Sequence, residues 1–135
     1  MKDKILAIVR FRARLEELCD RTDIKMEKVG AGIGTNTALA IAKIERLIDL
    51  KIRLVNFSVI FEHMIKGLSE SELLILSMRA NENSLSAIGE ELGISITSAM
   101  RYCDKILKRC ERRVACYDLS PYADLIKSYM HRDTA

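Results

Sequence analysis

The sequence predicts an all-α protein, and three observations support that prediction. Leu, Ile, Ala, Lys, Arg and Glu dominate the 135 residues, and all but Ile are strong helix formers. Only one proline, Pro121, interrupts the chain. Apolar residues recur every three or four positions over long segments, which is the spacing of one helix face. With 49% hydrophobic and 30% charged residues, the composition argues for a packed core and against global disorder.

The first segment, residues 1–66, is predicted to be an N-terminal helical hairpin with a long central helix. Residues 2–21 carry apolar side chains at helical spacing and form the first helix. The stretch 22–36, TDIKMEKVGAGIGTN, is expected to be a loop because its three glycines break helices. No strand precedes these glycines and no Gly-Lys-Ser/Thr ending follows, so they predict a connection and not a nucleotide site.

A pattern without a helix breaker, from about Thr37 to Lys66, predicts a central helix about 45 Å long. Its apolar face is too wide for a lone surface helix. Two explanations stay open: the whole face belongs to the core of the same chain, or part of it is a homodimer interface. The first apolar stripe consists of Ile41, Ile44, Ile48, Ile52, Val55 and Val59. The second consists of Leu47, Leu50, Leu54, Phe57, Phe61 and Met64.

The second segment, residues 67–116, opens with a helix-start signal. Gly67 ends the long helix, and Ser69 with Glu72 three residues later makes a capping box before an apolar run. The inner face of the helix that follows is expected to consist of Leu73, Leu76 and Ala80.

The stretch Ile88–Leu107, IGEELGISITSAMRYCDKIL, has the spacing of a helix-turn-helix. Gly89 is small where the two helices touch, and Gly93 stands where the chain needs a positive φ. Ser95 is predicted to cap the second helix. The combination is fairly specific for a DNA-reading unit. Its apolar positions are Ile88, Leu92, Ile94, Ala99 and Tyr102.

The second helix of this unit has two contrasting faces. A core stripe is formed by Ala99, Cys103, Ile106 and Cys110, and a basic stripe opposite is formed by Arg101, Lys105, Lys108 and Arg112. Residues 96–113 hold six basic and two acidic side chains, a balance of +4 against +3 for the whole chain. That concentration of charge favours phosphate contact.

The first two turns of such a helix enter the major groove of double-stranded DNA. Arg101 is the best base reader because its planar fork matches the acceptor edge of guanine. Asp104 is expected to repel phosphate, although it can accept a hydrogen bond from cytosine. With only one arginine in the reading turns, a single copy should bind weakly, and dimerisation through the long helix would add a second half-site. The predicted DNA-binding residues are Ser95, Ile96, Thr97, Ser98, Met100, Arg101, Lys105, Lys108 and Arg112.

The third segment, residues 117–135, is expected to be a tail with one short helix. Asp118 or Ser120 is predicted to cap it, and Pro121 suits its start. Whether this helix docks on the core or on a partner stays open. Its apolar residues are Tyr122, Leu125, Ile126 and Tyr129.

Several classes of function are disfavoured. The four cysteines form no CxxC pair and the two histidines lie far apart, so no metal site and no cofactor are expected. No nucleophile–base pair is visible, which argues against an enzyme. The cysteines are expected to be reduced and mostly buried. Without a signal peptide or an apolar run long enough to span a bilayer, a cytoplasmic protein with no membrane partner is expected.

The stretch LSESELLILSMRANENSLSAIGEELGISITSAMRYCDKIL resembles the fourth region of bacterial sigma factors. The wider layout is similar to small phage and prophage transcriptional regulators with a sigma-like C-terminus, which switch on late genes. The resemblance implies sequence-specific DNA binding near a promoter and contact with RNA polymerase. The chain departs from the family pattern at Ile96, where Arg or another polar residue is frequent, and at Asp104. A protein-interaction adaptor or a phage packaging subunit is the alternative function.

Overall fold

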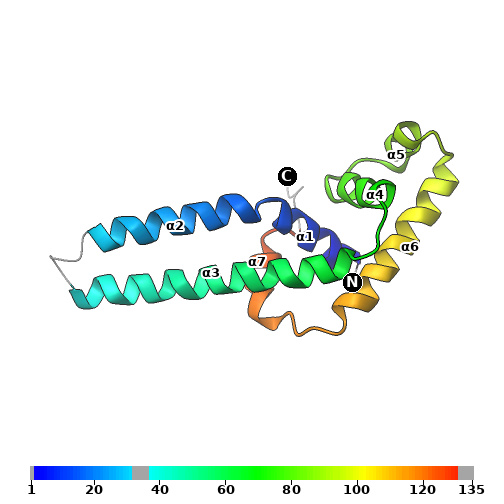
Figure 1. Cartoon of the computed structure of the whole chain (residues 1–135). Helices are drawn as coiled ribbons and strands as arrows, with labels where there is room; N and C mark the ends of the chain where they lie inside the picture. The colour runs from blue at the N-terminus through cyan, green and yellow to red at the C-terminus, as the bar shows by residue number, and fades with distance from the viewer. Residues whose placement is uncertain (1, 32–36, 131–135) are drawn as a thin grey trace.

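The computed structural model describes residues 2–31 and 37–130, and within them every regular element is a helix, so the all-α prediction is confirmed (Figure 1). The elements are α1 (Lys2–Ala13), α2 (Leu15–Ala31), α3 (Thr37–Ile65), α4 (Glu70–Ala80), α5 (Leu85–Leu92), α6 (Ile96–Val114), the 3-10 helix η1 (Ser120–Tyr122) and α7 (Ala123–Lys127).

The first helix is shorter than predicted. It was expected over residues 2–21, but α1 ends at Ala13. The backbone N–H of Arg14 donates to the Phe11 carbonyl at 3.0 Å, a tight i to i−3 bond that breaks the regular helix. The break lets α1 leave the line of α2 and turn into the core (Figure 1).

The loop predicted over residues 22–36 is wrong for its first ten residues, because α2 continues to Ala31. Gly30 is the penultimate residue of this helix, where a glycine costs at most about 1 kcal/mol relative to alanine. Packing of α2 along α3 outweighs that cost, and Leu15 and Thr22 are the buried residues of α2. Residues 32–36 lie outside the described part of the chain.

The helices α2 and α3 form an antiparallel hairpin that projects from the rest of the molecule (Figure 1). The α3 helix agrees with the prediction and, at 29 residues, is about 43 Å long. Lys51 on α3 pairs with Asp23 on α2 at 2.7 Å. The hydrogen bond from Lys51 to this carboxylate raises the pKa of the lysine.

The core lies at the other end of α3, where α1, α4, α6 and the C-terminal segment surround it. Its centre is aromatic: the Phe11 and Phe57 rings lie 4.7 Å apart, Phe11 and Tyr129 5.4 Å, and Phe57 and Tyr122 5.7 Å. The 1–66, 67–116 and 117–135 segments all contribute buried side chains to this one cluster. The tail helix therefore docks on the core of its own chain, split into η1 and α7.

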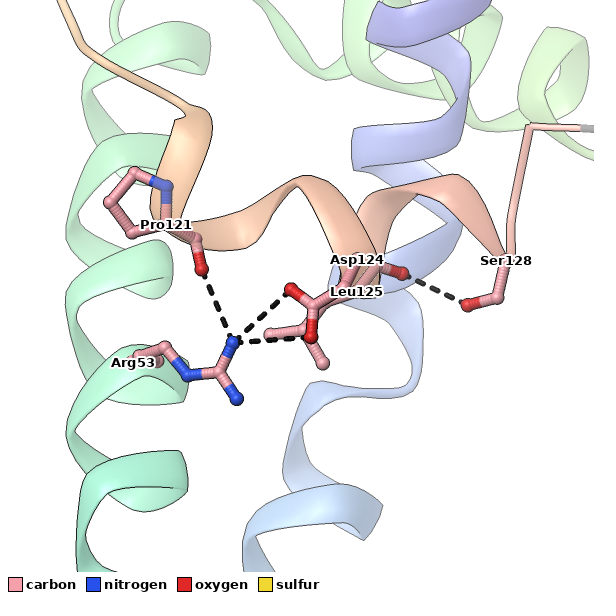
Figure 2. Close-up of polar contacts among 5 residues, drawn as sticks. All are labelled: Arg53, Pro121, Asp124, Leu125 and Ser128. Carbon is pink, nitrogen blue, oxygen red and sulfur yellow. Dashed lines mark hydrogen bonds and ion pairs between the residues drawn. The ribbon is translucent and has the colours of Figure 1, made fainter. Parts of the chain in front are cut away.

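Two arginines tie the C-terminal segment to the core. The Arg10 guanidinium donates to the carbonyls of Ala80 and Tyr129, and its side chain is only 9% exposed. Arg53 on α3 donates to the Pro121 carbonyl at 3.2 Å and to the Asp124 carboxylate at 3.2 Å (Figure 2). The Arg53 bonds fix where the C-terminal segment crosses α3, and the Arg10 bond to Tyr129 holds the end of that segment against α1.

The two apolar stripes of α3 have different environments, which resolves the question that the sequence left open about their burial. In the second stripe Leu54, Phe57 and Met64 are buried, and the others are half-buried. In the first stripe Ile44 is half-buried and the rest are exposed. The core therefore covers one stripe and leaves the other uncovered by the described residues.

Candidate nucleic-acid interface

The α4 helix, which supports the candidate interface, starts at the predicted capping box. The Glu72 N–H donates to Ser69 Oγ at 3.2 Å, and the Ser69 N–H donates to Glu72 Oε1 at 3.0 Å. This backbone donor holds the pKa of Glu72 below its usual range. Leu76 and Ala80 are buried as predicted, together with Ile75, whereas Leu73 is half-buried.

The connection between α5 and α6 has the predicted sharp turn. Gly93 adopts φ 68° and ψ 36°, the left-handed region that favours glycine. The Ile94 N–H donates to the Gly89 carbonyl at 2.9 Å. A Cβ added at Gly89 would lie 2.7 Å from the Ile94 carbonyl oxygen, so the turn requires the smallest side chain there.

The start of α6 is held by its cap. Ser95 Oγ accepts a hydrogen bond from the Ser98 N–H at 3.1 Å, and the Ser95 hydroxyl donates to Ser98 Oγ at 3.0 Å. Of the residues predicted to contact DNA, Ser95 and Ser98 therefore also orient the helix that presents the others.

Four of the predicted reading residues lie exposed on the first two turns of α6: Ile96, Thr97, Met100 and Arg101. Ile96 is 56% and Met100 46% exposed, so both apolar side chains are accessible at the start of the helix. Tyr102 was expected at an apolar core position, and this is wrong, because it is 50% exposed. It lies between the core and basic faces of α6.

The predicted core stripe of α6 is confirmed. Ala99, Cys103, Ile106 and Cys110 are all buried. Burial raises the pKa of Cys103, and raises that of Cys110 to about 11, so both thiols stay protonated. The expectation for the other cysteines is only partly met, because Cys19 is half-buried and Cys116 is exposed.

The predicted basic stripe is exposed along the outer face of α6. Arg101, Lys105, Lys108 and Arg112 all reach solvent, and within residues 2–31 and 37–130 none of their side chains makes an ion pair or a hydrogen bond. Their charges are therefore available to an anionic partner.

Arg109 and Arg113 have a different role, which the sequence analysis did not predict. Arg109 donates to the Lys66 carbonyl at 3.1 Å, and Arg113 donates to the carbonyls of His63 and Lys66. They satisfy carbonyls at the C-terminal end of α3, where positive charge also complements the helix dipole. No local sequence signal reveals this role, because the partners lie 43 to 50 residues away.

Asp104, which is predicted to repel phosphate, has a partner from the other end of the chain. Lys2 Nζ on α1 donates to Asp104 Oδ1 at 2.9 Å, and both side chains are about half exposed. The hydrogen bond and the charge of Lys2 lower the pKa of Asp104. The negative charge on this face is therefore partly neutralised.

Comparisons with protein-family models, with curated proteins and with solved structures give no match. Within the described residues no three His, Cys, Asp or Glu side chains cluster closely enough to hold a metal ion. None of the described helices combines the length and the apolar character needed to cross a membrane.

Proposed function

We propose that this protein is a sequence-specific DNA-binding transcriptional regulator that reads the major groove of double-stranded DNA with the first turns of α6. One observation carries the proposal. Exposed side chains able to contact bases lie at the start of a capped helix, directly followed by unpaired cations on the same helix.

The chemistry of these side chains suits the two parts of a DNA contact. Arg101 can donate two hydrogen bonds to guanine, while Ile96 and Met100 can pack on thymine methyl groups. Lys105, Lys108 and Arg112 lie further along the helix and suit phosphates, which fix the register on the duplex. The resemblance of residues 68–107 to sigma region 4 adds a promoter as the target, RNA polymerase as a partner and a phage or prophage as the source of the gene.

The primary test is selection of binding sites from a random double-stranded DNA pool with the purified protein. Enrichment of a motif is the expected result. The proposal is refuted if the folded protein enriches no sequence.

Single substitutions then separate base reading from phosphate contact. Arg101→Ala should cost about 1–3 kcal/mol on the selected site and relax the preference at one base position. Lys108→Ala should weaken binding to all sequences alike and reduce the slope of log affinity against log salt by about 1. Lys28→Ala, which removes the same charge from α2 at the far end of the molecule, is the matched control and should change neither quantity (Figure 1).

A second candidate function, a protein-interaction adaptor or a packaging subunit, is favoured by the exposed apolar side chains of Ile96, Met100 and Tyr102. An adaptor would bind its partner protein with little dependence on salt and would lose that binding in Met100→Asp. Strong salt dependence with DNA and an enriched motif would exclude this alternative as the main function.

A further inference from the structure

The first apolar stripe of α3, named here the outer stripe, is an uncovered surface with a defined geometry. It consists of Ile41, Ile44, Ile48, Ile52, Val55 and Val59, and its exposed members are 44% to 62% accessible to solvent. At about 100° per residue the stripe lies on the opposite side of α3 from Leu54 and Phe57, which are buried. The core therefore cannot cover it without a rotation of the whole helix, and α2 as described leaves every member except Ile44 exposed.

The other outer face of the same hairpin shows what a solvated surface looks like in this chain. On α2 the exposed side chains are mostly charged, and Ile24, at 51% exposed, is the one large apolar residue exposed on this helix as described. The apolar character is thus confined to the α3 side of the hairpin. A contiguous apolar patch of this kind marks an interaction surface.

The outer stripe repeats with a period of eleven residues. Ile41, Ile44 and Ile48 recur as Ile52, Val55 and Val59. Eleven residues in three turns give 3.67 residues per turn, close to the 3.6 of a straight helix, so the stripe hardly winds around α3. It therefore presents a line of branched side chains along about 27 Å, which suits another straight helix.

From this pattern we infer that the outer stripe is the interface of a homodimer in which two α3 helices pack antiparallel. The inference goes beyond the proposed DNA binding and does not depend on it. The stripe is nearly its own mirror image about position 50: Ile41 corresponds to Val59 and Ile48 to Ile52, while Ile44 corresponds to position 56, the neighbour of Val55. A reversed copy therefore meets the stripe in register, as a two-fold interface requires.

A charge at one end of the stripe favours the antiparallel orientation. Glu62 follows the stripe; its side chain is 63% exposed, and its carboxylate lies 4.0 Å from the Arg12 guanidinium on α1. In the antiparallel pair it lies beside the start of the partner's α3, where the helix dipole presents positive charge. In a parallel pair it would lie beside the negative C-terminal end of that helix, and the two helix dipoles would also repel.

The area of the stripe is sufficient for a reversible dimer. Five branched side chains that are about half exposed, together with the less exposed Ile44, offer on the order of 400 Å² of apolar surface per copy. In homodimer interfaces about 65% of the buried surface is apolar, so the total surface buried on both copies would be roughly 1,200 Å². That lies at the lower end of stable interfaces, so the dimer is expected to dissociate on dilution.

The first experiment measures mass against concentration by analytical ultracentrifugation. The wild type should pass from monomer, 15.3 kDa, to dimer over the micromolar range. Ile52→Asp should weaken association at least about a hundredfold, because it buries two unpaired carboxylates near the two-fold axis. Ile24→Asp is the matched control, since Ile24 and Ile52 are both 51% exposed, and it should dimerise like the wild type.

Circular dichroism shows whether each variant keeps its helices, and Val59→Asp is the substitute if Ile52→Asp unfolds. A wild type that stays monomeric at several hundred micromolar overturns the inference. So does an Ile52→Asp protein that is folded and dimerises as strongly as the control.

Disulfide cross-linking tests the orientation. It is performed with Cys116→Ser as background, because Cys116 is the exposed thiol. Positions 41 and 59 lie about 27 Å apart along one helix, whereas a disulfide needs Cα atoms within about 7 Å. A mixture of Ile41→Cys and Val59→Cys should form disulfide-linked dimers, and neither variant alone should. Efficient self-linking of Ile41→Cys would instead overturn the antiparallel arrangement.

Discussion

The close approach at Gly89 makes a prediction that runs against helix propensity. Gly89 lies inside α5, and replacing an exposed helical glycine by alanine normally stabilises a helix by about 1 kcal/mol. Here the new Cβ would lie 2.7 Å from the Ile94 carbonyl oxygen, well inside van der Waals contact. That oxygen belongs to the backbone of the turn, so it cannot move aside as a flexible side chain would.

We therefore expect Gly89→Ala to destabilise the protein. Overpacking of this kind typically costs about 1–3 kcal/mol, which exceeds the gain in helix propensity. A net loss of about 1 kcal/mol would lower Tm by about 4 °C in a chain of this size. The turn that orients α6 would also shift, so weaker DNA binding should accompany the lower Tm.

Thermal unfolding followed by circular dichroism measures the effect, and Gly30→Ala is the matched control. Gly30 also lies in a helix, but a Cβ there meets nothing within 4 Å. Gly30→Ala should therefore keep or raise Tm. If Gly89→Ala raised Tm as much as Gly30→Ala does, the argument from the close approach would be refuted.

Four further predictions follow from individual contacts. Asp104→Asn should strengthen binding to all DNA sequences alike, because it removes a negative charge from the phosphate-facing helix and the partner of Lys2; binding at several salt concentrations measures this. At pH 8, Cys116 should react with a thiol reagent at once because it is exposed. Cys110 should react only on unfolding, because Cys110 is buried and its pKa is raised to about 11. Mass spectrometry of the labelled peptides distinguishes the two. The folded state lowers the pKa of Glu72 from its ordinary 4.5, so the carboxylate stabilises the fold above that pH and this stabilisation is lost as the pH falls through the folded pKa. In urea titrations the difference in unfolding free energy between wild type and Glu72→Gln should therefore be largest at neutral pH and disappear in acid. In the antiparallel dimer the C-terminal ends of the two α3 helices lie about 45 Å apart, so the half-sites enriched from random DNA should be separated by more than one helical turn; a spacing of about 10 base pairs would contradict the arrangement.

The sequence by itself determined the features whose causes are local. The capping box at Ser69, the left-handed turn at Gly93 and the cap at Ser95 each depend on residues a few positions apart. The amphipathic character of α6 also follows from the sequence, because helical periodicity alone decides which residues share a face. The extent of α3 was predictable for the same reason, since its pattern contains no helix breaker.

The tertiary structure alone decided which apolar faces are covered and which charged side chains are paired. Periodicity identifies an apolar stripe but not its partner, so the burial of Phe57 and the exposure of Ile52 could not be distinguished in advance. The continuation of α2 through its predicted loop depends on packing against α3, which brings together residues well beyond one helical turn, such as Asp23 and Lys51, 28 positions apart. Likewise the pairing of Lys2 with Asp104 joins residues separated by 102 positions. Such contacts form only after the chain has folded, because the energy of a charge or an apolar face depends on what lies beside it in space.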